Sequence, residues 1–350
     1  MKLKKCFKNI NSLYGKKMIG CMEIPLYFYS TSKPKKLTAK QLTALKLQSE
    51  EGEIESSIKL GKFYLEDSKN LDHQSSLKYF KIAADKGDEN ALKNVAYLLR
   101  NGKGVETNLE LSFEYYKKAA DLGEVEAMQK LGDLYERGTG VKRNVELAIH
   151  YYQLASEKGN HAAMQKLGDL YKRGEGVEQS YQEALKYFLQ SESLGNSNAM
   201  LRLGEMYSSG RGVEKDEKKA FKYFKKASDL GNKKAHQILA KHYMSGDVVK
   251  ENPSKALEYV KKNPTETSLQ TLLKLSEENK ISSPDLLKYL KQLAKNGMVA
   301  AIKSLAIINY EGKLVQQNVK EAFKYASKEE VKEDAEILKL LGDLHFEGKG

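Results

Sequence analysis

Two stretches of the chain are almost identical and lie 36 residues apart. Residues 127–141 read AMQKLGDLYERGTGV, and residues 163–177 read AMQKLGDLYKRGEGV. Self-similarity at a fixed spacing of this length is typical of proteins built from stacked structural repeats. Equivalents of Leu131 mark each unit along most of the 350 residues. The markers are Leu60, Val95, Leu131, Leu167, Leu203, Leu239, Leu272, Leu305 and Leu341, in steps of 35, 36, 36, 36, 36, 33, 33 and 36 residues.

The first part of each unit predicts an amphipathic helix. Ala127, Leu131, Leu134 and Tyr135 fall at helical spacing on one face. Gly132 lies within this stripe, where a glycine weakens a helix by about 1 kcal/mol relative to alanine. We therefore expect a neighbouring helix to approach closely at this slot. Other units place another small residue there, which supports a size limit: Ala96, Ala240 and Ala306.

A glycine turn and a second helix follow. Gly138 ends the first helix, because glycine readily adopts the left-handed conformation. Asn144 then caps the second helix, since its side chain can accept from the unpaired N–H groups of the first turn. The same slot holds Asn108, Ser180, Asp216, Asn252 and Asn318. At Asn252 and Ser283 the next residue is proline, the favoured first residue of a helix. The second helix ends at Gly159, matched by Gly87, Gly123, Gly195, Gly231 and Gly297.

The full pattern, A-x3-L-G-x2-Y-x2-G-x-G-V-x2-[ND]-x3-A-x2-[YF]-[YF]-x2-A-x3-G, resembles the Sel1-like repeat, a relative of the tetratricopeptide repeat, over about residues 53–350. The resemblance implies an all-α fold: an α/α superhelical solenoid of about eight Sel1-like helix-turn-helix repeats plus a partial ninth. Physical reasoning favours the same fold, because one helix pair cannot bury its apolar face and neighbours must stack. The aromatic pair of the second helix, as in Tyr151-Tyr152, weakens in the last full units. These carry Tyr259-Val260, Tyr289-Leu290 and Tyr325-Ala326, so we expect looser packing and a degenerate solenoid around residues 250–300.

Both ends of the solenoid carry predictions. Residues 38–52 predict an N-terminal capping helix, opened by a capping box at Thr38 and Gln41. This helix would cover the first repeat with Leu42, Leu45 and Leu47. At the other end, the first helix of the ninth unit would lack its partner helix, so we expect the natural chain to continue past Gly350. Its unpartnered residues would be Leu341, Leu344 and Phe346.

The net charge of +12 is concentrated near the N-terminus. Residues 1–40 hold ten Lys and one Glu, which is +9, so the other 310 residues carry only +3. A nucleic-acid surface gathers Lys and Arg on one face, whereas Lys and Glu alternate along these repeats as on solvated helices. This distribution argues against a nucleic-acid partner for the repeats.

Residues 1–37 form a basic segment that bears Ser and Thr and is poor in acidic residues, which is typical of an organelle transit peptide. The stretch 28–32, FYSTS, resembles sites where mitochondrial presequences are cut. We therefore predict a mitochondrial protein, with a disordered tail on a cytoplasmic protein as the alternative. Both cysteines, Cys6 and Cys21, lie in this segment, so the repeats cannot be joined by disulfides.

No catalytic, cofactor or metal site is predicted, and we do not expect an enzyme. His236 and His242 are six residues apart, whereas a helical zinc motif places its histidines four apart. The paired glycines follow helices, whereas a phosphate loop follows a strand. No run of about 18 apolar residues is present, so no transmembrane helix is expected.

A row of polar residues is the candidate partner-binding groove. Equivalent positions of successive repeats line up along one surface of a solenoid. One interpretation is a polar inner groove for a peptide or protein, and the other is a solvated surface or ion pairing between repeats. The residues are Gln129, Lys130, Asp133, Gln165, Lys166, Asp169, Arg202 and Glu205.

The predicted function is a non-catalytic scaffold or adaptor whose partners are other proteins. Sel1-like proteins are adaptors in membrane-bound protein degradation, cell-wall synthase regulation and mitochondrial complex assembly. With the basic N-terminus, the resemblance favours assembly or maturation of a mitochondrial complex. The alternatives are an adaptor in endoplasmic-reticulum-associated degradation or cell-wall synthase regulation, and an organellar RNA-binding repeat protein. Pentatricopeptide repeats have a similar period but lack the Gly-x-Gly-Val turn. A β-lactam-binding role, linked to cysteine-rich bacterial relatives, is disfavoured because the repeats contain no cysteine.

Overall fold

Pairs of helices form the repeats, and most of these helices have 13 residues. The computed structural model describes residues 37–66, 71–278 and 280–346, so the predictions for residues 1–36 lie outside the described part. The first helices are α3(Ile54–Glu66), α5(Glu89–Asn101), α7(Val125–Arg137), α9(His161–Arg173), α11(Ser197–Ser209), α13(Lys233–Ser245), α15(Glu266–Glu277), α17(Val299–Glu311) and α19(Ala335–Phe346). The second helices are α4(His73–Asp85), α6(Leu109–Asp121), α8(Val145–Glu157), α10(Tyr181–Ser193), α12(Glu217–Asp229), α14(Pro253–Lys262), α16(Ser283–Lys295) and α18(Val319–Ala326). Helix α2(Ala39–Glu50) precedes them, and a short 3-10 turn, η1(Glu329–Val331), leads into α19.

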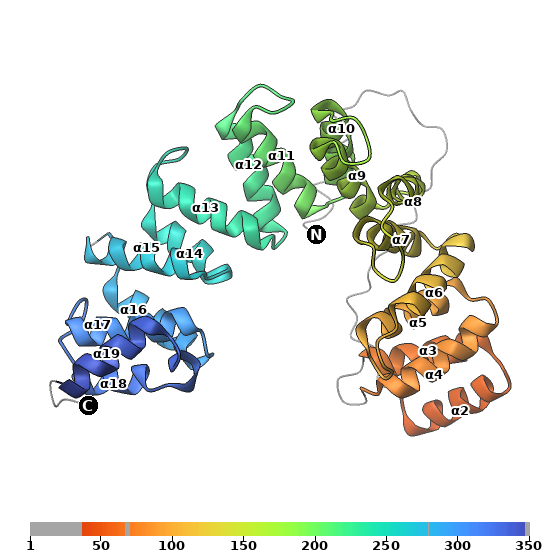
Figure 1. Cartoon of the computed structure of the whole chain (residues 1–350), viewed down its shortest axis with the longest axis horizontal. Helices are drawn as coiled ribbons and strands as arrows, with labels where there is room; N and C mark the ends of the chain where they lie inside the picture. Colours follow the sequence, from red (N-terminus) through yellow and green to blue (C-terminus); the bar gives the residue numbers. More distant parts are fainter. Residues whose placement is uncertain (1–36, 67–70, 279, 347–350) are drawn as a thin grey trace, which may run out of the picture.

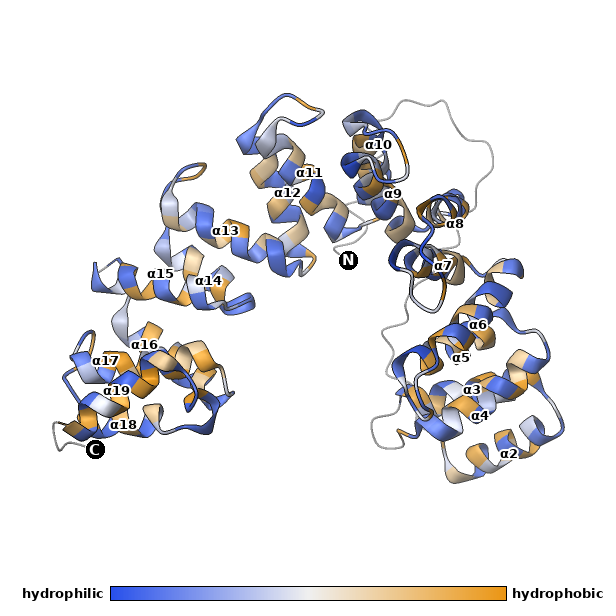
Figure 2. Cartoon of the chain, viewed as in Figure 1, coloured by the Kyte–Doolittle hydropathy of each residue, from blue (hydrophilic) through white to orange (hydrophobic). Residues whose placement is uncertain are grey.

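The helix pairs follow one another in chain order along an arch, with α2 at one end and α19 at the other (Figure 1). Each helix carries both apolar and polar residues, as expected for helices that bury one side (Figure 2). The described residues contain no strand. These features confirm the predicted all-α solenoid of eight helix pairs and a partial ninth.

The glycine of the first helix makes room for an aromatic ring. A Cβ added at Gly132 would lie 2.4 Å from the ring of Tyr152, a fully buried residue of the second helix in the same repeat. The predicted close approach is therefore confirmed, and the approaching group is the second residue of the aromatic pair. The same contact recurs between Gly61 and Phe80, Gly168 and Phe188, and Gly204 and Phe224.

The first residue of the aromatic pair has a different partner. The ring of Tyr151 stacks on that of Tyr135 in the first helix, with 5.7 Å between centroids. Two later repeats stack Tyr171 on Tyr187 and Tyr207 on Tyr223, both at 5.6 Å. The stacked tyrosines thus pack the two helices of one repeat together.

The local signals for helix boundaries are mostly confirmed. The side chain of Asn144 accepts a hydrogen bond from the backbone N–H of Leu147, and all five equivalent residues cap their helices in the same way. Gly138 has φ +70°, in the left-handed region. The expectation for Ser283 is wrong by one position, because Ser282 is the cap residue of α16. The Ser283 hydroxyl lies 2.7 Å from that of Ser276 and is engaged there instead.

The two ends differ in part from expectation. Thr38 and Gln41 form the predicted capping box, but Leu47 is 57% exposed and does not cover the first repeat. Ser49 is the buried residue of α2, and its hydroxyl lies 2.7 Å from that of Ser57. In α19, Phe346 is 95% exposed, as predicted, whereas Leu344 is fully buried. Leu344 therefore has partners, because α17 and α18 contact α19.

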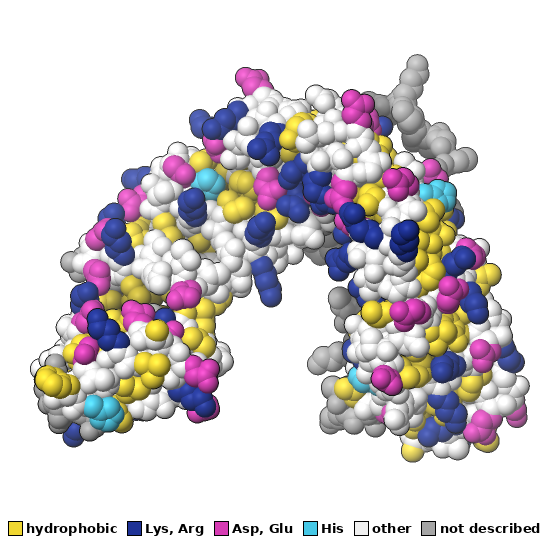
Figure 3. All heavy atoms as spheres, in the orientation of Figure 1, with side chains coloured by type: hydrophobic (Ala, Val, Ile, Leu, Met, Phe, Trp, Pro, Cys, Tyr) yellow, Lys and Arg dark blue, Asp and Glu magenta, His cyan; other side chains and the backbone are white. Residues whose placement is uncertain are grey.

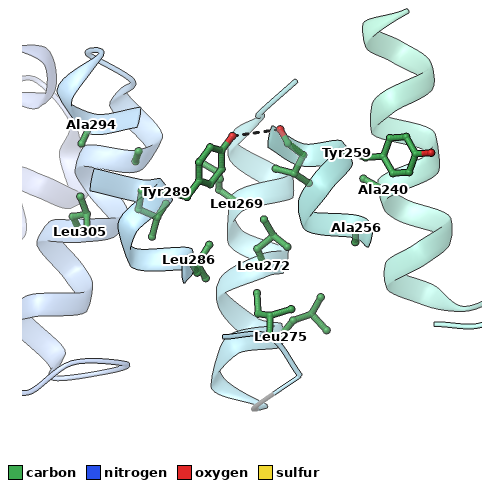
Figure 4. Close-up of a cluster of buried hydrophobic side chains, with 14 of the residues drawn as sticks. Ala240, Ala256, Tyr259, Leu269, Leu272, Leu275, Leu286, Tyr289, Ala294 and Leu305 are labelled. Carbon is green, nitrogen blue, oxygen red and sulfur yellow. Dashed lines mark hydrogen bonds between the residues drawn. The ribbon is translucent and has the colours of Figure 1, made fainter. Parts of the chain in front are cut away.

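The repeat built from α15 and α16 is irregular. These helices contact each other much less than the helix pairs on either side do, and α15 also contacts α13 and α17 directly. Figure 4 shows that the core nevertheless continues through this region, with Leu269, Leu272 and Leu286 between the helices. The Tyr289 hydroxyl donates to the backbone oxygen of Val260 at 3.4 Å (Figure 4). The predicted looser packing is found here.

Candidate binding surface

The first helix of each repeat has one polar side that points away from the core. We call the surface that these sides form along the solenoid the first-helix face. In α7, Leu131 and Leu134 are buried in the core, while Asp133 and Glu136 lie on the other side of the helix and are partly exposed. The eight predicted groove residues belong to α7, α9 and α11 and lie on this face. Figure 3 shows that acidic and basic side chains are mixed over the visible surface of the arch.

Residues of α7 and α9 form a connected polar network. Gln129 is buried and donates to the carboxylate of Asp133 at 2.5 Å. Lys166 of the next repeat lies 3.4 Å from Asp133 and 2.8 Å from Glu136. The Tyr152 hydroxyl lies 2.8 Å from Asp133 and 2.7 Å from Glu136, so it can donate its proton to either carboxylate. Burial would raise the pKa of Glu136, but the hydrogen bonds from Lys166 and Tyr152 lower it below its ordinary value.

The same arrangement continues from α9 to α11. Gln165 donates to Asp169, and the Arg202 guanidinium of the following repeat lies 2.8 Å from the same carboxylate. Arg202 also lies 3.1 Å from Glu205, which in turn accepts from Lys172 at 3.5 Å. Burial would lower the pKa of Arg202, but Asp169 and Glu205 raise it above its ordinary value.

Seven of the eight predicted residues therefore pair within this network, and two of the pairs, Lys166 with Asp133 and Arg202 with Asp169, cross a repeat boundary. This geometry matches the interpretation of ion pairing between repeats, while a role in binding a partner stays a prediction. Lys130 is partly exposed and has no hydrogen-bond or ion-pair partner within the described ranges. The network leaves few unpaired polar groups on α7 and α9 for a partner to bind.

One hollow borders the network. It has a volume of about 490 Å³ and lies between α9, α11 and the start of α13. Gln165 and Arg202 from the predicted set contribute to its wall, with Asn198, Asn232 and Lys234 beside them. The Asn232 amide donates to Asn198 at 2.9 Å, which closes part of the wall.

Two further hollows lie on either side of α15 and were missed by the sequence analysis. The first, of 650 Å³, lies between α13, the end of α14 and the start of α15. The second, of 210 Å³, lies between α15 and α17. The irregular 33-residue steps and Pro264 were the signals at this place, but they do not reveal an open space. The first-helix face is thus filled by paired charges near α7–α9 and hollowed around α15.

His236 and His242 have different hydrogen-bond partners. His236 is buried, with Nε2 3.1 Å from the backbone oxygen of Ser228, whereas His242 Nδ1 lies 2.9 Å from Asp247. Within the described residues, no group of three or more His, Cys, Asp or Glu side chains is placed to hold a metal ion. No helix in that part of the chain is long and apolar enough to span a membrane.

Comparison with known proteins agrees with this geometry. The sequence pattern of the Sel1 repeat matches residues 54–88, 90–124, 125–160, 161–196, 197–232, 234–262 and 299–328. The longest gap between these matches, 263–298, contains α15 and α16, the irregular pair. No curated protein matches the chain.

Two solved structures are similar over most of the chain. A protective antigen of uropathogenic Escherichia coli strains, with an SLR fold, is 26% identical with a TM-score of 0.63, covering 89% of this chain and 68% of its own. A Sel1 repeat protein from Oxalobacter formigenes is 27% identical with a TM-score of 0.57, covering 77% of this chain and 96% of its own. Because seven repeats match and together span most of its length, this chain belongs to the Sel1 repeat family.

Proposed function

We propose that this chain is a non-catalytic scaffold that binds other proteins through its first-helix face and serves the assembly or maturation of a mitochondrial complex. The observation that supports binding at this face is the opening of three hollows between consecutive first helices, of about 490, 650 and 210 Å³. The two hollows beside α15 combine apolar and polar residues in their walls, which suits the side chains of a partner. Membership of the Sel1 repeat family supports a protein partner.

The test of the binding face is site-directed photo-cross-linking in the full chain. A photoreactive amino acid replaces Lys241 or Gln270, which line the two openings of the first-helix face on either side of α15. Matched positions on exposed sites of second helices are Glu114 of α6 and Lys222 of α12. We expect discrete adducts with proteins from Lys241 and Gln270 only. Equal cross-linking from both sets of positions would contradict the proposal.

The mitochondrial role is supported by the basic, acid-poor composition of residues 1–36. Imaging of a C-terminally tagged chain, with and without these residues, tests it. We expect the full chain in mitochondria and the shortened chain elsewhere. The same location for both chains would contradict the proposed mitochondrial role and leave the proposed scaffold function unaffected.

The RNA-binding alternative predicts salt-sensitive binding of RNA by the repeats, because phosphate contacts release counterions. The paired charges of the first-helix face speak against it, since Lys166 and Arg202 are already neutralised by carboxylates.

A further inference from the structure

A shortened helix opens the larger hollow beside α15. Helix α14 has 10 residues, whereas the second helices α4 to α12 have 13. It ends at Lys262 before Asn263-Pro264, and a proline cannot continue the preceding helix. In earlier repeats the second residue of the aromatic pair is a large ring that packs against the small residue of the first helix. In this repeat Val260 takes the place of the ring, and the small residue is Ala240. Ala240, Val260 and Asn263 all line the 650 Å³ hollow, so both features lie at its wall.

This hollow has an apolar floor and a neutral polar rim. Ala240, Met244 and Val260 provide the floor. Hydroxyl and amide groups form most of the rim, including Thr267 and Thr271, and one cation, Lys241, borders it. An aliphatic side chain fits such a site, because burial of apolar surface stabilises it by about 25 cal/mol per Å².

The smaller hollow has an apolar floor and an acidic rim. Leu273 and Ile307 contribute to its floor. The charged residues around it are Glu266, Glu277, Glu311, Glu336, Lys303 and Lys313, an excess of two negative charges. Lys303 is already paired, 2.9 Å from Asp334 and 3.3 Å from Glu336, and Lys313 lies 3.0 Å from Glu311. Within the described ranges Glu277 has no cation within ion-pair distance, so this rim can take a basic side chain.

One helix separates the two hollows. Glu266, Gln270, Leu273 and Glu277 fall at helical spacing along one side of α15, and Thr267 and Thr271 lie along the adjoining side. The helix between the hollows is about 10 Å across. An extended chain in the polyproline-II conformation advances about 3.1 Å per residue with three residues per turn. Residues three apart then face the same side about 9 Å apart, so their side chains can reach both hollows.

We infer that α15 is the docking ridge for an extended segment of a partner protein with an aliphatic residue three positions from a lysine or arginine. The aliphatic side chain enters the hollow beside Val260, and the cation meets Glu277 on the other side of the helix. The excess of negative charge around the smaller hollow favours a basic side chain in the partner. This inference rests on the proposed scaffold function and names the chemistry of its partner.

The test measures binding of a fluorescent synthetic peptide to the full chain by anisotropy. The probe is a ten-residue Gly/Ser peptide with one Leu and one Lys three positions apart, and its controls carry Ser for the Leu or Glu for the Lys. We expect each control to bind at least about tenfold more weakly, a loss typical of removing one anchor at an interface. Equal binding of all three peptides would overturn the inference.

Variants of the chain locate the site. Thr271→Arg places a long cationic side chain at the rim of the aliphatic hollow, and Glu277→Lys reverses the charge at the other. Each should weaken binding about tenfold or more, and Glu277→Lys should favour the peptide that carries Glu. The matched control is Glu114→Lys, an exposed carboxylate on α6, which should leave binding unchanged. Circular dichroism verifies the fold, and should Thr271→Arg unfold, the exposed Glu277 variant still decides the test.

Two results separate this inference from the proposed function. If no peptide binds while photo-cross-linking still finds proteins at the first-helix face, the partner chemistry inferred here is wrong and the scaffold proposal stands. If the peptide binds only after residues 1–36 are removed, the occupant is the chain's own basic segment, and the inference of a partner segment is overturned.

Discussion

The contact between Gly132 and Tyr152 gives the sharpest quantitative prediction. Replacing the glycine by alanine has two opposite effects on α7. Alanine favours the helix by about 1 kcal/mol. Its Cβ, however, would lie 2.4 Å from a ring that is fully buried, so the ring must move by about 1 Å to reach ordinary contact. Overpacking of this kind costs roughly 1–3 kcal/mol, so the net change for Gly132→Ala ranges from about neutral to 2 kcal/mol destabilising.

The same slot in the ninth unit provides the control. A Cβ at Gly342 of α19 would meet nothing within 4 Å, so Gly342→Ala should stabilise its helix by about 1 kcal/mol. Because the helix-propensity gain is common to both variants, the difference between them isolates the clash, at about 1–3 kcal/mol. Local opening free energies from hydrogen exchange, taken separately for α7 and α19, suit an array that need not unfold in one step.

A second variant tests the cause. In the background Tyr152→Val, which copies the pairing of Ala240 with Val260, Gly132→Ala should become stabilising by about 1 kcal/mol. Equal stabilisation by Gly132→Ala and Gly342→Ala in the wild-type background would refute the reasoning, because the ring would then not limit the slot. The repeat formed by α5 and α6 carries Ala96 with the buried Tyr116. An alanine is therefore compatible with a ring where the packing of both helices accommodates it.

Three further predictions follow from the geometry. Burial acts to raise the pKa of Glu136, but Lys166, Tyr152 and Arg173 together lower it below its ordinary value. This carboxylate therefore stabilises the fold above its ordinary pKa and loses that effect as pH falls through the lowered value. The stability difference between wild type and Glu136→Gln, followed by denaturant titration, should therefore shrink on acidification below about pH 4.5; a difference that grows would contradict this. Gly140→Ala should be more destabilising than Gly159→Ala: both have φ near +70° to +82°, but a Cβ at Gly140 would lie 2.2 Å from a backbone oxygen of α6, while one at Gly159 meets nothing. Similar melting temperatures for the two variants would show that this interface between repeats can accommodate the added Cβ with no loss of stability. Asn144→Ala should cost about 1 kcal/mol through the lost cap of α8, and hydrogen exchange should show the loss in the first turn of that helix; unchanged exchange there would argue against the cap.

Most of the secondary structure could be predicted because its causes are local. Caps such as Asn144 act within one turn of a helix, and the glycine turns act within a few residues. The wrong cap at Ser283 shows the limit of this reasoning, since its hydroxyl is engaged by Ser276 in the preceding helix.

The candidate surface was predicted less well, because its properties depend on residues one repeat apart. The row of Asp133, Lys166 and their equivalents was visible, but whether these groups bind a partner or each other depends on distances across 33 residues. The structure pairs them. The openings around α15 depend on where the chain places that helix after Pro264, which no local pattern specifies.

The sequence by itself determined the repeat, its period, the helix boundaries and the order of stacking, because each unit repeats the same local signals and an apolar face must be covered by its neighbour. Only the tertiary structure decided which charges are neutralised and where the surface stays open. Those properties arise from small displacements summed over several packed helices, and a missing ring or a helix shortened by one turn changes them without altering the pattern that specifies the fold.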